Sequence, residues 1–287
     1  MKYGICCSQL LGIAPSAQDV IDFAQEAERL GFNSIVVGEH ILMPRDFDDS
    51  VYPAGTFEGG TPWYDPLVFL AVIAGATKTI RLGTGVAVVA YRQPVPQAQA
   101  IATLDFMSGG RLFYGAGVGW MREEFEALGV PFAERGARCD EYIEVMKLLW
   151  SGSTEPFQGK FISFNGGRIN PLPTQKPHPP ILIGGETSPA LRRIARLGDG
   201  FYINWKSLPE YRKLMDELAG HMADRGRSMS QLYGQLGATE MSFVQAQKAA
   251  IPEYEASGVH EIIFSPKCYS VDEGMATMRQ FAEEFIG

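Results

Sequence analysis

Short apolar, β-branched runs alternate with amphipathic stretches along almost the whole chain. Within residues 16–30, apolar side chains recur at helical spacing from Val20 to Leu30, which predicts an amphipathic helix. Ser16 stands where a helix N-cap is favoured, and Gly31 stands where a left-handed residue commonly ends a helix. The next run, residues 34–38, is apolar at successive positions, as expected of a parallel strand covered by helices.

The same alternation repeats along the chain. Strands are expected at residues 3–8, 34–38, 81–89, 112–118, 181–184, 201–204, 236–243 and 261–265, and helices at 16–30, 66–77, 96–107, 122–128, 134–150, 188–197, 208–225, 245–257 and 271–285. A loop rich in Pro and Gly is expected over 44–62. Residues 151–179 break the rhythm and predict an insertion with a small hairpin between strands four and five. Eight strand–helix alternations predict an α/β fold, a single (β/α)8 TIM barrel over residues 1–287.

Composition narrows the range of partners. Hydrophobic residues make up 46% of the chain and charged residues 20%, which suits a large buried core. The net charge is −8 without any run of Lys and Arg, so neither nucleic acid nor membrane is an expected partner. The N-terminus has no signal-peptide pattern, and the apolar run at 67–76 is shorter than the about 20 residues that span a bilayer. A cytoplasmic protein with reduced, mostly buried cysteines is expected.

In a TIM barrel, ligands bind at the C-terminal ends of the strands, so polar residues that follow a strand are candidates for a site. His40 stands two residues beyond the second expected strand, which ends at Gly38, and follows Glu39. A histidine there is a candidate proton donor or acceptor, since histidine is the side chain that titrates near neutrality. A structural histidine bonded to a neighbouring loop fits the spacing equally well.

Glycines interrupt the third expected strand, at Leu82-Gly83-Thr84-Gly85-Val86. A glycine inside a strand often marks a bulge or a close approach of the main chain to a ligand. A flat ring system at the barrel mouth would need such bare main chain. Tight packing within the barrel would need it as well.

The fourth strand leads into a helix through Gly115-Ala116-Gly117-Val118-Gly119-Trp120. This segment superficially resembles the dinucleotide fingerprint G-x-G-x-x-G. Trp120 stands at the third glycine position, however, and the segment lies in mid-chain, so a Rossmann fold is rejected. Trp120 either packs at the strand end or forms the wall of a ring pocket.

The segment Gly184-Gly185-Glu186-Thr187-Ser188 passes from the fifth strand into a helix. Backbone N–H groups at a helix start bind phosphate well, and here glycines permit close approach while hydroxyl groups add donors. Glu186 must then point away from the phosphate. The alternative is that Thr187 or Ser188 simply caps the helix.

Other chemistries find little support in the sequence. His178, His221 and His260 are isolated, without a carboxylate or cysteine at metal-ligand spacing, so no metal site is expected. The sequence contains no P-loop, no G-x-S-x-G elbow and no H-E-x-x-H motif.

These segments, in this order, resemble the luciferase-like monooxygenase superfamily, and most closely its branch that uses the deazaflavin coenzyme F-420. The matching text includes GFNSIVVGEH, DPLVFLAVIAGATKTIRLGTGVAV, QAIATLDFMSGGRLFYGAGVGWMREEFEALGV and PHPPILIGGETSPALRRIARLGDGF. The resemblance covers residues 1–205 with strong motifs and the remainder only in general pattern.

The resemblance implies a role for each candidate residue. Glu39-His40 stands where the family usually has Asp-His, which places Glu39 near the pyrimidine end or the sugar-like chain of the cofactor and His40 near its reactive ring. The stretch from Gly83 through Thr84 to Val86 corresponds to a bulge that backs the ring with a non-proline cis peptide, expected at Gly85-Val86. Gly117 and Gly119 would flank the ring, and Gly184, Gly185 and Thr187 would hold the cofactor phosphate.

The function that the resemblance implies is hydride transfer between coenzyme F-420 and a small organic substrate, with His40 handling the accompanying proton. Two alternatives stay open, an FMN-dependent monooxygenase and a non-catalytic flavin- or deazaflavin-binding protein. Sugar-phosphate dehydrogenases of the superfamily carry Glu in place of Trp120 and Trp in place of Pro44, so a bulkier or more apolar substrate is expected. The resemblance also implies a homodimer through the helix at 66–77 and its neighbour.

Overall fold

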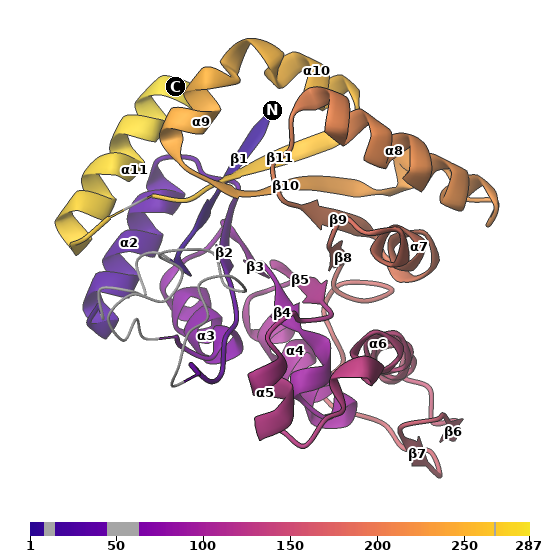
Figure 1. Cartoon of the computed structure of the whole chain (residues 1–287). Helices are drawn as coiled ribbons and strands as arrows, with labels where there is room; N and C mark the ends of the chain where they lie inside the picture. The colour runs from indigo at the N-terminus through magenta and orange to yellow at the C-terminus, as the bar shows by residue number, and fades with distance from the viewer. Residues whose placement is uncertain (9–14, 45–62, 267) are drawn as a thin grey trace.

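The computed structural model of the chain describes residues 1–8, 15–44, 63–266 and 268–287. Parallel strands close into a barrel, and the helices surround it (Figure 1). Around the barrel the strand order is β3-β2-β1-β11-β10-β9-β8-β5, and β3 pairs with β5 to close the ring. Strand β4 continues β3 after an interruption and also pairs with β5. The expected eight-stranded TIM barrel is therefore confirmed.

Strands and helices alternate in chain order. The strands of the barrel are β1 (Lys2–Cys6), β2 (Ser34–Val37), β3 (Arg81–Thr84), β4 (Ala87–Val88), β5 (Leu112–Gly117), β8 (Ile181–Gly184), β9 (Gly200–Ile203), β10 (Tyr233–Thr239) and β11 (Val259–Phe264). The helices are α2 (Ala17–Arg29), α3 (Pro66–Ala76), α4 (Pro94–Met107), α5 (Arg122–Ala127), α6 (Arg135–Trp150), α7 (Ser188–Leu197), α8 (Leu208–Ala223), α9 (Met241–Ala246), α10 (Ile251–Ala256) and α11 (Val271–Phe285).

Local signals in the sequence set several of these boundaries. Ser16 caps α2 in a capping box with Asp19, and Gly31 follows that helix with a φ of 83°, in the left-handed region that favours glycine. The Asp65 carboxylate accepts hydrogen bonds from the first turn of α3. Most expected elements are found within one to three residues of their predicted bounds. The expected loop at 44–62 lies, beyond Pro44, outside the described residues.

Two expectations in the C-terminal third were wrong. Strand β10 begins at Tyr233, three residues before the expected 236, and ends at Thr239, four residues before the expected 243, because α9 begins at Met241. The early start includes Gln235, which is buried in the barrel and donates to the Glu261 carboxylate at 2.7 Å. The single helix expected at 245–257 is two short helices, α9 and α10. Pro252 stands in the first turn of α10, where its missing N–H is tolerated, and it therefore begins a new helix.

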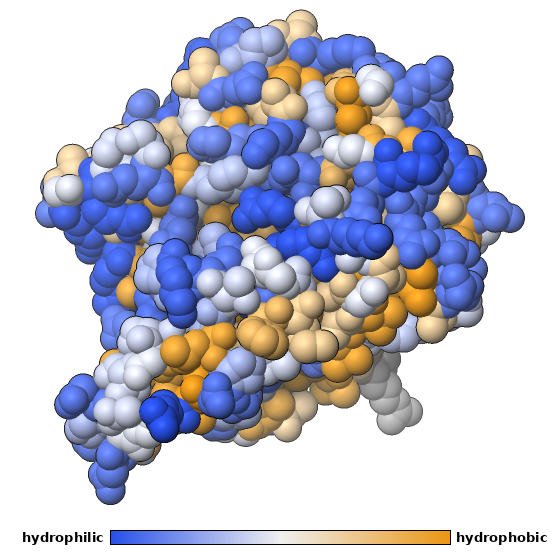
Figure 2. Space-filling view, turned by 180° about the vertical axis from the view of Figure 1, so that it is seen from behind, coloured by the Kyte–Doolittle hydropathy of each residue, from blue (hydrophilic) through white to orange (hydrophobic). Residues whose placement is uncertain are grey.

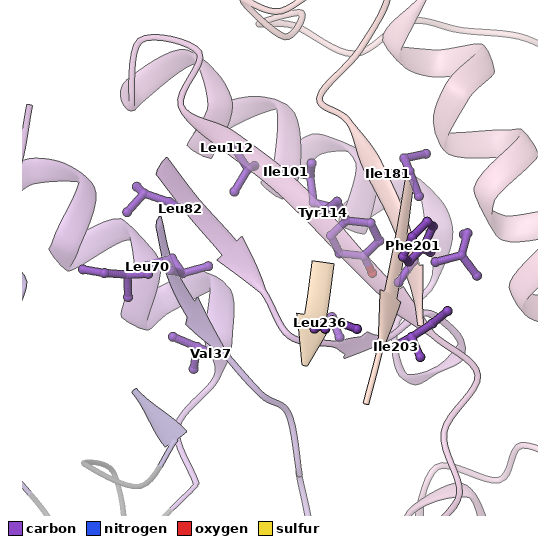
Figure 3. Packing of buried hydrophobic residues seen from close by; sticks show 14 of the residues in the cluster. Val37, Leu70, Leu82, Ile101, Leu112, Tyr114, Ile181, Phe201, Ile203 and Leu236 are labelled. Carbon is purple, nitrogen blue, oxygen red and sulfur yellow. The ribbon is translucent and has the colours of Figure 1, made fainter. Parts of the chain in front are cut away.

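Successive strand residues point alternately into the barrel and toward the helices. The barrel interior is a layer of side chains from six strands: Cys6, Val36, Phe113, Leu182, Tyr202 and Ile263. Their sequence neighbours, such as Val37 and Leu112, lie instead between the strands and the outer helices, against Leu70 of α3 and Ile101 of α4 (Figure 3). The barrel is thus a filled core, and a ligand can bind only at its ends.

The insertion at 151–179 contains the expected hairpin, formed by β6 (Phe157–Gln158) and β7 (Ser163–Phe164). The Glu141 carboxylate on α6 holds the hairpin by accepting hydrogen bonds of 2.7–2.9 Å from the backbone N–H groups of Lys160, Phe161 and Ile162. The hairpin therefore packs on a barrel helix and makes no second domain.

The four cysteines, Cys6, Cys7, Cys139 and Cys268, are buried free thiols. Among the described residues, no helix combines the length and the apolar character needed to cross a membrane.

Candidate active site

A cavity of about 590 Å³ opens at the C-terminal ends of the strands, a volume typical of small-molecule sites. Every strand of the barrel contributes to its wall. The lining residues are Cys6 and Ser8 at the β1 end, Gly38 to His40 after β2, Gly85, Val86 and Val88 around β4, Gly117 to Trp120 at the β5 end, Gly184 and Gly185 at the β8 end, Tyr202 and Asn204 at the β9 end, Thr239 and Glu240 at the β10 end, Ser265 after β11, and Trp63, Tyr91 and Glu124 from other segments.

The cavity brings together most of the residues singled out in the sequence. Those that line it are Glu39, His40, Gly85, Val86, Gly117, Gly119, Trp120, Gly184 and Gly185. Thr187 does not line it and stands instead at the N-cap of α7. Gly83 and Thr84 lie deeper in the barrel. A Cβ atom on Gly83 would lie 2.1 Å from the Phe113 ring, and Thr84 is fully buried with its hydroxyl donating to the Gly115 carbonyl at 2.7 Å. Tight packing within the barrel, the second of the two interpretations of this strand, therefore explains Gly83 and Thr84.

The floor of the cavity is formed by Val86 and the main chain around it. The Gly85–Val86 peptide bond is cis, as the resemblance implied, and it interrupts the strand between β3 and β4. A Cβ atom on Gly117 would lie 2.6 Å from Cγ2 of Val86, and one on Gly184 would lie 3.0 Å from its Cγ1. The two glycines therefore leave room for Val86, and together they present a surface with few side chains.

His40 is bonded to Glu124, a residue that the sequence reasoning missed. Nδ1 of His40 lies 3.2 Å from Oε2 and 3.3 Å from Oε1 of Glu124, which comes from α5 and is 1% exposed. The same carboxylate accepts from the Ile41 N–H at 2.6 Å and from the Tyr91 hydroxyl. Burial raises the pKa of Glu124, but the hydrogen bonds from His40, Tyr91 and Ile41 outweigh it and lower that pKa overall.

Two indole rings flank the imidazole of His40. The Trp63 ring centroid lies 4.7 Å from that of His40 at an interplanar angle of 75°, and the Trp120 centroid lies 5.6 Å away at 79°. Both pairs have the edge-to-face geometry that aromatic rings favour. Trp120 is 46% exposed, so its ring forms an open apolar wall next to His40.

The second acidic residue of the site, Glu39, is committed to structural contacts. Its buried carboxylate is paired with Arg92 and accepts from the Val88 N–H at 2.6 Å. Burial raises the pKa of Glu39, and the Arg92 charge beside it opposes that increase. Arg92 also binds Asp65, the residue that caps α3. Glu39 thus fixes the β2 end to the β4 segment.

The turn after β8 has several features of an anion site. Gly185 has a φ of 119°, and Thr187 is the N-cap residue of α7, although its side chain makes no capping hydrogen bond. Glu186 points to Lys206 instead, with 2.9 Å between its Oε2 and Nζ of the lysine. The Gly185 N–H donates to the Tyr202 carbonyl at 3.2 Å, so a phosphate would use donors that follow Gly185.

Glu124, Tyr91 and Trp63 could not be found by the reasoning applied to the sequence. Glu124 stands in the run Arg122-Glu123-Glu124, which is typical of a solvated helix start. The apolar Phe125 beside it is the one local signal that this side of the helix is buried. Among the described residues, no group of three His, Cys, Asp or Glu side chains is placed to bind a metal ion.

The sequence model of the luciferase-like monooxygenase family matches residues 1–251. The chain belongs to the luciferase-like monooxygenase family. Its fold agrees with this assignment, because two solved structures match over essentially the whole chain. A monooxygenase from Streptomyces bottropensis has a TM-score of 0.80 at 23% identity and covers 100% of this chain and 99% of its own. An F-420-dependent secondary alcohol dehydrogenase in complex with an F-420–acetone adduct has a TM-score of 0.77 at 16% identity, with 98% of each chain covered.

Curated relatives of this luciferase-like protein include users of both cofactors. An uncharacterized protein of Mycobacterium tuberculosis is 31% identical over 292 residues, 98% of each chain. An F-420-dependent glucose-6-phosphate dehydrogenase of Amycolatopsis mediterranei is 32% identical over 64% of this chain and 52% of its own. An FMNH2-dependent dimethylsulfone monooxygenase of Pseudomonas putida is 32% identical over 47% of this chain and 38% of its own. The family therefore comprises oxidoreductases and monooxygenases with F-420- and FMN-dependent members.

Proposed function

We propose that this luciferase-like protein is an oxidoreductase that transfers hydride between coenzyme F-420 and an uncharged organic substrate. The proposal rests on one observation: three residues without a side chain, Gly85, Gly117 and Gly184, line the same cavity as His40. A planar heterocycle needs such a surface to lie flat beside a proton-transfer group. When bound, the coenzyme would supply a ring carbon that accepts or donates hydride.

The residues present fit a flat ring with a phosphorylated tail. Gly117 and Gly184 keep side chains other than that of Val86 off the floor, and a Cβ atom at either position would press on Val86. The turn that contains Gly185 and Thr187 opens α7 from the same rim, where the N–H groups of a helix start favour an anion. We therefore assign the ring to the floor and the phosphate to this turn.

The walls of the cavity favour an uncharged substrate. Among its described lining residues there is no Lys or Arg, so no cationic side chain there could pair with a phosphate or carboxylate of the substrate. Glu39 is paired with Arg92, and Glu124 is bonded to His40 and Tyr91. Trp120 and Trp63 provide apolar surface next to His40. His40 would then take or supply the proton that accompanies hydride transfer.

Binding and turnover with purified protein test this assignment. The protein is titrated separately with F-420 and with FMN, and each complex is assayed with a panel of uncharged alcohols, ketones and enones. We expect tighter binding of F-420 and turnover with it. Tight FMN binding with weak F-420 binding would favour a flavin monooxygenase instead, and binding without turnover across the panel would favour a non-catalytic binding protein.

We also propose that two copies associate through α3 and α4. Four large apolar side chains are exposed on these adjacent helices: Val68, Val72, Phe106 and Met107. In Figure 2, apolar surface gathers in a band across the lower half of the molecule, the half that carries α3 and α4 in Figure 1. Helix α3 contains no charged residue, which is unusual for a helix with an exposed face.

A further inference from the structure

We propose that Glu124 is a positioning residue that fixes the tautomer of His40, with the hydrogen on Nδ1 and the lone pair on Nε2. The tautomer itself follows from hydrogen bonds within this chain. Only its consequence for catalysis rests on the proposed function, so the two can fail separately.

The donors around Glu124 determine the tautomer. An ionised carboxylate can only accept hydrogen bonds. Oε1 accepts from the main-chain N–H of Ile41 at 2.6 Å, and Oε2 accepts from the Tyr91 hydroxyl and faces Nδ1 of His40 at 3.2 Å. The contact with Nδ1 is therefore a hydrogen bond only if Nδ1 carries the hydrogen. The lowered pKa of Glu124 keeps this carboxylate ionised at neutral pH.

The surroundings also hold the imidazole ring in one orientation. Trp63 and Trp120 contact the ring edge-to-face and so restrict the plane in which it lies. A half-turn that keeps this plane would turn a C–H group toward Glu124 in place of Nδ1 and lose the hydrogen bond. Oε1 accepts from the main-chain N–H of Ile41, the residue that follows His40. This bond fixes the position of the carboxylate relative to the histidine. With Nδ1 bonded to Glu124, Nε2 is on the side of the imidazole away from the carboxylate.

This tautomer suits the proposed reaction. In the oxidation of an alcohol, a bound coenzyme would accept the hydride from the carbon, and Nε2 of His40 would accept the proton released as the O–H bond breaks. The carbonyl bond forms, and the imidazolium that results is hydrogen-bonded to the Glu124 carboxylate. Reduction of a carbonyl runs the same steps backwards, with Nε2 as the donor. The opposite tautomer, with hydrogen on Nε2, could not accept the proton.

Glu124→Gln should move the hydrogen of His40 from Nδ1 to Nε2, because glutamine has nearly the same shape as glutamate but carries an NH2 donor. The Ile41 N–H can only donate, so the carbonyl oxygen of the glutamine must take the place of Oε1. Its NH2 group then takes the place of Oε2, the oxygen nearer to Nδ1 of His40 (3.2 Å, against 3.3 Å to Oε1). There the Tyr91 oxygen can accept, and we expect Nδ1 of His40 to accept. In serine proteases, the equivalent change from carboxylate to amide beside the catalytic histidine imposes the wrong tautomer and lowers kcat about 10⁴-fold.

Nitrogen NMR of the 287-residue chain tests the inference without any coenzyme. The chain has four histidines, so selective ¹⁵N-histidine labelling gives a spectrum that His→Gln variants can assign. In spectra recorded at about pH 8, we expect the hydrogen of His40 on Nδ1 in the wild type and on Nε2 in Glu124→Gln. The matched control, Tyr91→Phe, removes a donor to the same oxygen but leaves the carboxylate, and should keep the wild-type tautomer.

Turnover with F-420 and an uncharged substrate gives the second readout. We expect Glu124→Gln to lower kcat by about 10²–10⁴-fold while the Kd for the coenzyme stays within about twofold and Tyr91→Phe loses much less. A hydrogen on Nε2 in the wild type, or an unchanged tautomer in Glu124→Gln, overturns the inference. An inverted tautomer in a protein that never turns over with F-420 would instead uphold it and reject the proposed function.

Discussion

Arg92 binds the buried carboxylate of Glu39 at the mouth of the barrel, and its other terminal nitrogen binds Asp65 at the start of α3. The Glu39 side chain is fully buried, whereas that of Arg92 is 22% exposed. One guanidinium thus joins the β2 end, the segment after β4 and a barrel helix. The pair stabilises the frame in which His40, the next residue after Glu39, is held.

Removing this guanidinium should be strongly destabilising in a pH-dependent way. We expect Arg92→Met to lower the free energy of unfolding by about 3–5 kcal/mol at pH 7, because a buried carboxylate is left without its partner. Burial raises the pKa of Glu39 in the folded state, so the variant recovers stability as the pH falls and this carboxyl is protonated. Urea unfolding at pH 7 and pH 5 measures the effect. The double variant with Glu39→Gln should lose the pH dependence.

A second carboxylate, that of Glu28, contributes to stability with the opposite dependence on pH. Oε1 of Glu28 accepts hydrogen bonds of 2.6–2.9 Å from the N–H groups of Lys78, Thr79 and Ile80, just before β3. Burial opposes ionisation, but these bonds outweigh it and lower the pKa of Glu28 to about 2. Its stabilisation is therefore present above pH 4.5, the ordinary value, and is lost as the pH falls toward about 2.

We expect Glu28→Gln to lower the free energy of unfolding by about 1–3 kcal/mol at pH 7, a range that allows for the partial exposure of this side chain. The difference from the wild type should close in acid. Glu283→Gln, at an exposed position on α11, is the matched control and should change stability by less than about 0.5 kcal/mol. A gap that stays constant down to pH 3 would contradict the assignment.

The floor of the cavity should be sensitive to a single methyl group. In Gly117→Ala, the new Cβ would lie 2.6 Å from Val86, which must move toward the cavity. We expect about a tenfold or greater loss of coenzyme affinity and a stability loss of about 1–3 kcal/mol. Gly220→Ala on α8 is the control, because no atom lies within 4 Å of its Cβ. It should leave binding unchanged and raise stability by up to about 1 kcal/mol.

His40→Ala separates chemistry from binding. Loss of a general acid or base lowers turnover by about 10²–10⁴-fold, whereas the floor and the turn before α7 still hold the coenzyme. We expect the Kd for F-420 to change by less than about threefold, measured by fluorescence titration. His221→Gln, on the outer helix α8, should be silent in both assays. Full activity in His40→Ala would remove this histidine from the reaction.

The proposed dimer predicts a change of molar mass in solution. Val68 of α3 is 67% exposed, and a charge at this position would oppose burial against a second copy. Light scattering should give twice the 31.5 kDa of the chain for the wild type and the mass of one chain for Val68→Glu. Leu128→Glu, which replaces an exposed leucine outside α3 and α4, should leave the mass unchanged.

The sequence predicted the barrel well because each strand and helix carries its own periodicity. The apolar periodicity fails where a polar side chain is buried. Gln235 interrupts the apolar pattern at the start of β10, and its partner Glu261 lies on the neighbouring strand β11. The sequence also indicates which glycines matter, but not the contact that requires each of them. Gly83 makes room for Phe113, and Gly117 makes room for Val86, and neither contact can be read from local sequence.

The site was predicted in part for a similar reason. His40 and Gly185 follow strands, so the rule that strand ends meet at one rim brings them together. Glu124 and Tyr91 reach the same rim from α5 and from a turn after β4, and their meeting depends on how these segments pack. Three glutamates stand within four residues of α5, at 123, 124 and 126, and the glutamates alone do not distinguish the one that is buried.

The hairpin on α6 lies away from the cavity in which the reaction is proposed to take place. The hairpin at 157–164 is attached to the outside of the scaffold through Glu141, and no residue of 151–179 lines the cavity. A fusion or a fluorescent label placed at the hairpin tip would consequently report on the molecule without perturbing its reaction. The same independence would let this segment diverge freely among related proteins that share one chemistry.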